Sequence, residues 1–282
     1  MTLGDPRRLS GIWLGKRPYG PVLALQERLR EARADGRIED VVLLLEHHPV
    51  VTLGRGADVA NVLLGADALA ARGFECVRTS RGGDVTLHAP GQLVGYPIVD
   101  LRPDRCDVRR YVKDLGEVMR RLALRHGVAG GPVDGLIGLW VDRQSVRKWD
   151  APDPSSSKEG AARDLSKLGA IGVRVSQWVT MHGFALNLTT NTDLFQIIVP
   201  CGIREHGVTS ILELTGRAPD PREEAVHAHS FLADVLGREL GVFADWSDRP
   251  LATDLPDEPG AANPNVVDEV KTMQEPPLAG AS

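Results

Sequence analysis

The stretch KLGAIGVRVSQWVTMHGFALNL, Lys167 to Leu188, alternates apolar residues with small or polar ones in two runs. The alternating positions are Ile171, Val173 and Val175 in the first run, and Phe184, Leu186 and Leu188 in the second. A period of two residues is typical of a β-strand, because successive side chains point to opposite faces. Two such runs separated by a short turn predict a β-hairpin.

Outward from this hairpin, both strands and helices are expected. Short apolar runs predict strands at 40–46, 74–80, 91–101 and 136–142. Apolar stripes at helical spacing predict helices at 21–36, 107–127 and 221–240, with Asp220 as N-cap of the last one and Pro221 at its first position. The order lacks the strict alternation of a doubly wound sheet. The sequence therefore predicts an α+β domain with a mixed β-sheet flanked by helices.

Composition limits the organisation and the possible partners. The 282 residues carry a net charge of -5, and residues 247–282 alone hold seven acids and two bases, so the rest of the chain is neutral. A neutral body argues against nucleic-acid binding, and the longest apolar run, Val41 to Leu45, is too short to span a membrane. We expect one catalytic domain over 1–248 with a mobile loop at 143–165, and a disordered, acidic, Pro/Ala/Gly-rich tail over 249–282. With no secretory signal pattern, the expected location is cytoplasmic.

Three cysteines, Cys76, Cys106 and Cys201, cannot all pair with one another, and a reducing cytosol would keep them as thiols. A lone cysteine is usually a small buried apolar residue. Cys201, however, stands between Pro200 and Gly202, where a sharp bend would present both the thiol and the following backbone N–H groups. Such a nucleophile needs a nearby cation or base, for which Lys167, His182 and His88 are candidates.

Two further motifs bear on ligand chemistry. RGGD, Arg81 to Asp84, is a glycine turn whose N–H groups could approach a ligand, but it matches neither a Walker loop nor a Rossmann fingerprint. In EHHP, residues 46–49, the adjacent histidines would point to opposite faces of a strand, and the chain has no HExxH or CxxC pair. The sequence therefore predicts no metal site and no cofactor.

Four spaced motifs together resemble those of the octanoyl-ACP:protein octanoyltransferases, or lipoyl(octanoyl) transferases, of the biotin/lipoate protein ligase superfamily. They are RGGDVTLHAPGQLVGYPIVDL at 81–101, KLGAIGVRV at 167–175, HGFALN at 182–187 and VPCGI at 199–203, and EHHPVVTLGRGAD at 46–58 adds to the likeness. The resemblance covers roughly residues 10–246 and implies a biotin/lipoate protein ligase-like catalytic domain.

What the resemblance implies is transfer of an octanoyl or lipoyl group from acyl carrier protein to a lysine of lipoyl domains, through a cysteine thioester. The acceptors would be the lipoyl domains of 2-oxoacid dehydrogenase complexes and the glycine cleavage H protein. By motif position Cys201 is the nucleophile and Lys167 the residue that lowers its pKa. The implied substrate contacts are Arg81, Gly82, Gly83, Asp84, Val85, Thr86, Leu87, His88, Ala170, Ile171, Gly172, Gly183, Phe184 and Ala185. The family usually has tyrosine at Leu87 and glycine at Ala89.

Elementary chemistry agrees with this interpretation. An acyl group that arrives as a thioester is already activated, so no nucleotide is needed. The acceptor lysine has a pKa of about 10.4 in water and must lose a proton, for which Lys167, paired with the thiolate, is the hypothesised shuttle. Burying seven methylene or methyl groups would contribute on the order of 5 kcal/mol, and Val85, Leu87, Ile171 and Phe184 are the expected walls of the acyl slot.

Three alternatives stay open at this point. An ATP-dependent lipoate or biotin ligase would need no cysteine nucleophile. A cysteine amidase or hydrolase would use Cys201 with His182 or His88 and release its acyl group to water. A non-catalytic acyl or lipoyl-domain binder would leave Cys201 inert.

Overall fold

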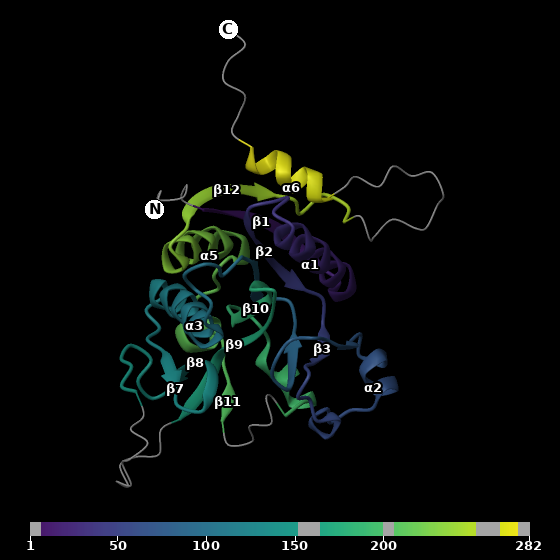
Figure 1. The fold of residues 1–282 in the computed structure, drawn as a ribbon. Coiled ribbons are helices and arrows are strands. Elements are labelled where there is room, and N and C mark those ends of the chain that lie inside the picture. Colours follow the sequence, from purple (N-terminus) through teal and green to yellow (C-terminus); the bar gives the residue numbers. More distant parts are fainter. Residues whose placement is uncertain (1–6, 152–163, 200–205, 252–265, 276–282) are drawn as a thin grey trace.

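The computed structural model describes residues 7–151, 164–199, 206–251 and 266–275. A nine-stranded mixed sheet runs through the molecule in the order β12-β1-β2-β6-β10-β9-β8-β7, with β11 paired to β9 (Figure 1). Its strands are β1 (Arg8–Arg17), β2 (Asp40–His47), β6 (Gln92–Ile98), β7 (Gly131–Val133), β8 (Leu136–Asp142), β9 (Leu165–Ser176), β10 (Val179–Asn187), β11 (Gly207–Val208) and β12 (Glu239–Asp245). Both parallel and antiparallel neighbours occur, so the predicted mixed sheet is confirmed.

The predicted hairpin is formed by β9 and β10. Val179 pairs with Ser176, and the ladder continues to the Leu186–Gly169 pair. The turn consists of Gln177 and Trp178, both with positive φ (53° and 64°). Two consecutive residues in that region are the geometry of the turn whose twist matches that of an antiparallel strand pair. The hairpin therefore brings the KLGAIGVRV and HGFALN motifs side by side.

Strands in the middle of the sheet bury both faces. On β2, Val42 and Leu44 pack into one core, whereas Val41, Leu43 and Leu45 pack into the other. This explains the continuous apolar run, because a strand covered on both sides needs no polar alternation. Helices α3 (Val108–Arg125) and α5 (Pro221–Leu236) cover the first face, while α1 (Tyr19–Ala34) and α6 (Val266–Gln274) cover the second (Figure 1).

A three-stranded sheet lies beside the main one. It has the order β4-β3-β5 and is formed by β3 (Val50–Leu53), β4 (Glu75–Arg78) and β5 (Val85–His88). Its own apolar core collects side chains from β3 and β5, from α2 (Ala66–Ala71) and from the 3-10 helix η2 (Thr192–Ile197). The 3-10 helix η1 (Val59–Asn61) and α4 (Ile211–Thr215) complete the described elements. The small sheet matters for function because β5 follows directly on the RGGD turn.

The predicted start of the last large helix is also confirmed. The Asp220 side chain accepts hydrogen bonds from the backbone N–H groups of Arg222 and Glu223, and Pro221 is the first residue of α5. These bonds satisfy two of the donors that a helix N-terminus leaves open.

The predicted disorder of the tail, 249–282, is wrong for α6. Val266, Val267 and Val270 are buried against the core beneath α1, and Leu251 is buried with them. An apolar stripe at helical spacing within a region of disorder-prone composition accounts for the difference. Residues 152–163 of the predicted mobile loop lie outside the described residues, as do residues 252–265 and 276–282 of the tail. No helix in the described part of the chain is long and apolar enough to cross a membrane.

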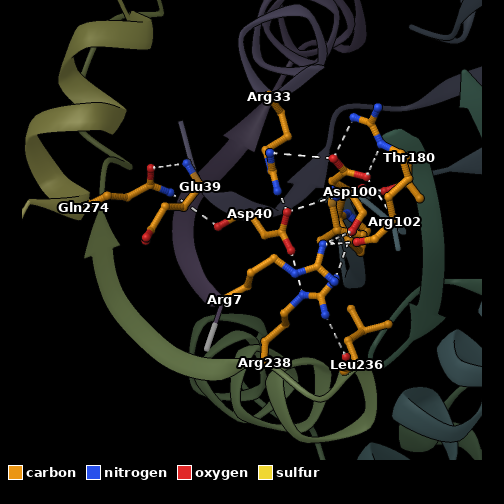
Figure 2. Close-up of polar contacts among 12 residues, drawn as sticks. Arg7, Arg33, Glu39, Asp40, Asp100, Arg102, Thr180, Leu236, Arg238 and Gln274 are labelled. Carbon is orange, nitrogen blue, oxygen red and sulfur yellow. Dashed lines mark hydrogen bonds and ion pairs between the residues drawn. The ribbon is translucent and has the colours of Figure 1, made fainter. Parts of the chain in front are cut away.

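A buried cluster of charges ties these layers together, and Asp40 lies at its centre (Figure 2). One Asp40 oxygen accepts from Arg33 of α1 at 2.7 Å and from the Asp100 backbone N–H at 2.9 Å, and the other accepts from Arg238 at 2.7 Å. Asp40 side-chain atoms are 0% exposed. Gln274 of α6 bonds the backbone on both sides of the Glu39–Asp40 peptide. Three other segments therefore meet at one carboxylate, and α6 bonds the backbone next to it.

Candidate active site

The RGGD turn is held rigidly by the small sheet and by β9. The Arg81 guanidinium, 7% exposed, donates to the backbone oxygen of Thr52 at 2.7 Å and to its hydroxyl at 2.9 Å. The Gly82 N–H donates to the Val173 oxygen at 2.9 Å. A Cβ at Gly172 would lie 3.1 Å from the Arg81 side chain. Glycine at position 172 therefore lets the turn lie directly on the hairpin.

Strand β5 divides its residues between two environments. Thr86 and His88 line a cavity between the small sheet and the hairpin, whereas Val85 and Leu87 are 0% exposed in the core of the small sheet. The division follows from strand geometry, because successive side chains of a β-strand point to opposite faces of the sheet. The expectation that Val85 and Leu87 form walls of the acyl slot therefore needs correction: their side chains point away from the cavity.

The cavity gathers most of the residues that the sequence motifs single out. Its lining is Tyr19, Arg81, Gly83, Asp84, Thr86, His88, Tyr96, Ala170, Ile171, Gly172, His182, Gly183, Phe184 and Ala185. Of the expected substrate contacts, only Gly82, Val85 and Leu87 do not line it. Tyr19 and Tyr96 are not among the expected contacts: Tyr19 lies in none of the motifs, and Tyr96 lies in the GQLVGYPIVDL part of the first motif, for which no substrate contact is predicted. Only the tertiary fold shows that α1 and β6 reach this place.

Three buried histidines lie at the cavity: His88 and His182 line it, and the His47 ring packs against His88 and Tyr96. Burial lowers the pKa of His88 to about 4 and those of His47 and His182 to about 3, with nearby positive groups adding to the effect. The His47 Nε2 atom bonds the Tyr96 hydroxyl at 2.9 Å. All three rings are therefore neutral at pH 7. Within the described ranges, no group of three His, Cys, Asp or Glu side chains is placed to hold a metal ion.

His182 has an unusual backbone. Its φ is 59°, one of three positive values among the non-glycine residues that the structure describes. Its N–H donates to the Gln26 side chain at 3.0 Å, and its Nδ1 atom is buried without a hydrogen-bond partner in the described structure. Strained backbone tends to occur at functional sites. The sequence offered His182 only as a base candidate, and this geometry adds that its ring is held against the cavity.

Lys167 is held near the cavity by three strands. It lies on β9, where it pairs with Trp140 of β8 and Val208 of β11, and its side chain is buried. The Nζ atom lies 4.9 Å from the centre of a Trp140 ring, an attractive cation–π arrangement. A second small cavity contains Lys167 and shares Thr86, Ala170 and Ala185 with the first. The two cavities are therefore neighbours across one layer of motif residues.

Cys201 lies outside the described residues, but the residues that flank its segment are described. Val199 donates its N–H to the Asn61 oxygen at 2.7 Å. On the other side of the segment, His206 contacts the Trp140 ring edge to face at 5.4 Å, and β11 follows at once. Trp140 is also the ring that faces Lys167. The two other cysteines, Cys76 and Cys106, are exposed free thiols.

Ala89 introduces no backbone strain. Among the described non-glycine residues, only Gln177, Trp178 and His182 have positive φ, so alanine stands at position 89 in an ordinary conformation. Its side chain is buried in the core of the small sheet. Gly91, two residues later, does need glycine: its φ is +84°, and a Cβ there would lie 2.6 Å from the Thr189 hydroxyl.

Comparison with known proteins follows the same residues. The family model of the lipoyl protein ligase A/B catalytic domain matches residues 18–229. An octanoyltransferase of Myxococcus xanthus is 47% identical over 219 residues, which cover 77% of this chain and 57% of that protein. An octanoyltransferase of Acidobacterium capsulatum is 40% identical over 250 residues, which cover 86% of this chain and 94% of that protein.

Solved structures agree on the fold. A bi-partite lipoate protein ligase from Thermoplasma acidophilum superposes with a TM-score of 0.61 at 12% identity, covering 94% of this chain and 92% of that one. A lipoate-protein ligase A bound with ATP gives 0.59 at 16% identity, covering 95% and 94%. The expected fold class is therefore confirmed. The chain belongs to the lipoyl protein ligase A/B catalytic domain family, among its octanoyltransferases.

Proposed function

We propose that this acyltransferase carries an octanoyl or lipoyl group as a thioester on Cys201, taking it from acyl carrier protein and passing it to a lysine of a lipoyl domain. The proposed acceptors are the lipoyl domains of 2-oxoacid dehydrogenase complexes and the glycine cleavage H protein. One observation carries the proposal. The buried side chain of Lys167 lies beside the motif-lined cavity, and the Trp140 ring contacts both Lys167 and His206, the first described residue after the Cys201 segment.

The two half-reactions balance without a cofactor. The Cys201 thiolate attacks the carrier thioester, the enzyme thioester forms, and the carrier leaves as a thiolate that takes up a proton. The neutral lysine amine then attacks the enzyme thioester, the amide forms, and the Cys201 thiolate leaves, while the attacking nitrogen gives one of its two protons to the Lys167 amine that protonated the carrier thiolate. A positive side chain nearby stabilises the thiolate that begins and ends the cycle. Lys167 is the proposed partner for that charge and for those protons.

The cavity is suited to an activated acyl group. Ile171, Phe184 and Ala185 give it apolar surface, and the glycines at 83, 172 and 183 line it with backbone alone. Ile171 and Phe184 are the proposed walls for the acyl chain, because the side chains of Val85 and Leu87 point away from the cavity. Burial of an eight-carbon chain against such walls would contribute on the order of 5 kcal/mol.

The decisive test is the intact mass of the protein after mixing with octanoyl-acyl carrier protein in the absence of acceptor. We expect a gain of one octanoyl group, and we expect Cys201→Ser to remove it. Cys106→Ser is the matched control, since that thiol is exposed and should leave the gain unchanged. Acyl transfer that requires ATP and survives Cys201→Ala would identify a ligase instead. Release of free octanoate in the presence of a lipoyl domain would identify a hydrolase.

A further inference from the structure

A chain of side-chain hydrogen bonds runs under the cavity floor from β11 to His88. The Asn187 amide nitrogen donates to the backbone oxygen of Thr209 at 3.0 Å. The Gln92 amide nitrogen donates to the Asn187 Oδ1 atom at 2.8 Å. The His88 Nδ1 atom then contacts the Gln92 Oε1 atom at 2.7 Å. All three side chains are buried, with exposed fractions of 3%, 2% and 6% for Asn187, Gln92 and His88.

The direction of every bond in this chain is fixed by its first member. The Thr209 oxygen is a backbone carbonyl, which can only accept, so the Asn187 atom beside it must be the amide nitrogen. The Asn187 oxygen therefore faces Gln92, and the Gln92 amide nitrogen must donate to it. That leaves the Gln92 oxygen for His88, and Nδ1 of the ring has to be the donor. A second contact, from the Gln92 nitrogen to the Leu87 oxygen at 3.4 Å, agrees with this orientation.

The ring of His88 is consequently the tautomer with hydrogen on Nδ1. Burial, opposed by the Gln92 hydrogen bond and helped by the Arg81 charge, lowers the pKa of His88 to about 4, so the ring carries a single proton at neutral pH. The other nitrogen, Nε2, then holds a lone pair. Because His88 lines the cavity and its Nδ1 atom is engaged, Nε2 is the atom that can accept a hydrogen bond from a ligand there.

We propose that Gln92 and Asn187 are positioning residues that lock His88 in this tautomer, so that its Nε2 atom accepts an N–H from the amine of the acceptor lysine. The proposal rests on the function proposed above. An octanoyl chain has no hydrogen-bond donor, whereas a neutral amine has two N–H groups and must aim its lone pair at the thioester carbon. One N–H held by Nε2 orients that lone pair, which is how fixed partners accelerate an attack.

The relay also connects the two halves of the site. The N–H of Thr209, whose carbonyl starts the relay, donates to the backbone oxygen of Lys167 at 3.0 Å. Thr86, on the same strand as His88, lines both the cavity that contains His88 and the one that contains Lys167. A single hydrogen-bonded frame therefore sets the positions of His88 and of the Lys167 backbone.

The kinetic test separates the two half-reactions by single-turnover measurement. Gln92→Met keeps the volume of the side chain but cannot accept from Nδ1. We expect transfer from preformed octanoyl-enzyme to a lipoyl domain to slow at least tenfold, and acylation by octanoyl-acyl carrier protein to change less than threefold. Exposed Gln144→Met is the control and should change neither rate. Slowing of acylation alone would assign the N–H donor to the carrier's pantetheine amides and overturn the amine assignment. Equal slowing of both steps, or no slowing of either step, would also overturn it.

The structural test needs no activity. Long-range ¹⁵N–¹H spectra of the wild-type enzyme should show His88 with a protonated Nδ1 and an unprotonated Nε2, and Gln92→Met should shift it toward the other tautomer. Gln92→Glu, which can still accept from Nδ1, should keep the wild-type tautomer. A wild-type His88 protonated on Nε2 overturns the relay even if the methionine variant fails to fold. If wild-type enzyme forms no octanoyl-enzyme, the cysteine route has failed, and the spectra still decide the relay.

Discussion

The Asp40 cluster and the polar side chains at the cavity, His47, His88, His182 and Gln26 (the cavity cluster), are both buried groups. They differ in how completely their hydrogen-bonding atoms have partners. Both Asp40 oxygens are occupied, by Arg33, Arg238 and a backbone N–H, as Figure 2 shows. Beside the cavity, in contrast, the Nδ1 atom of His182 and the amide nitrogen of Gln26 are buried without partners in the described structure.

The difference separates structural from functional burial. A buried polar group costs stability unless it is hydrogen-bonded, so a fully satisfied cluster is what a fold-holding role requires. Unsatisfied atoms beside a cavity retain bonding capacity for a ligand or a water molecule. Three residues meet at Asp40: Arg238 just after α5, Arg33 of α1 and Asp100 of the segment after β6. Their contacts with one carboxylate fix the relative positions of these layers. The cavity cluster can then be less stable than an ideal core.

The largest effect is expected from Asp40→Asn. The substitution leaves the buried Arg238 without its countercharge and leaves Arg33 with only the more distant Asp100 at 3.9 Å. Removal of one partner from a buried ion pair costs about 3 to 5 kcal/mol. The free energy of unfolding, from urea titration, should fall by that amount, while the folded fraction keeps its acyl transfer rate at low temperature. Asp35→Asn is the control, because Asp35 is 65% exposed and its ion pair should matter by less than about 0.5 kcal/mol. Equal losses in the two variants would refute the structural role.

Lys167→Met should show the opposite pattern. Methionine retains the apolar contact with Trp140 but removes the ammonium, so the unfolding free energy should change by less than about 1.5 kcal/mol. The rate of enzyme acylation should fall by on the order of 100-fold, or about 2.7 kcal/mol, because the thiolate loses its positive neighbour. Exposed Lys148→Met serves as the control. A large loss of unfolding free energy with an unchanged acylation rate would show that Lys167 supports the fold and not the reaction.

Acid should destabilise the cavity cluster first. The pKa values of His47, His88 and His182 lie below their ordinary value in the folded protein, so the unfolded chain binds protons more readily between about pH 6.5 and 4. Their contribution to stability is complete above pH 6.5 and is lost as the pH falls, by roughly 1.5 to 2 kcal/mol each at pH 5.

Urea titrations at pH 7.5 and 5.0 measure this loss. In His47→Gln the difference between the two pH values should shrink by roughly the share of one histidine, about 1.5 to 2 kcal/mol. The arginines of the Asp40 cluster keep their charge over this range, so Arg238→Lys should leave the pH difference unchanged. If the His47 variant keeps the full difference, the proton uptake takes place elsewhere.

The local sequence pattern predicts the hairpin, the late helix and the mixed sheet. Strand alternation and helix capping depend on residues close in sequence, such as Ile171 and Val173 in the hairpin and Asp220 at the helix start. The glycine motifs predicted most of the cavity lining. Alternation on β5 could have removed Val85 and Leu87 from the expected acyl walls. No local signal could have joined Asp40 to Arg238, 198 residues away, because that pairing depends on how α5 crosses the sheet.

The smallest expected effect concerns Gln274, and it asks whether α6 belongs to the Asp40 cluster. Its side chain accepts from the Glu39 N–H at 2.8 Å and donates to the Asp40 backbone oxygen at 3.3 Å. Gln274→Ala should cost about 1 kcal/mol, whereas Lys271→Ala on the exposed side of α6 should cost almost nothing. Combined with Asp40→Asn, the two changes should interact by at least about 0.5 kcal/mol if they act on one unit. Strict additivity would instead show that α6 covers β2 without supporting the carboxylate, and the Asp40 cluster would end at Arg33, Asp100 and Arg238.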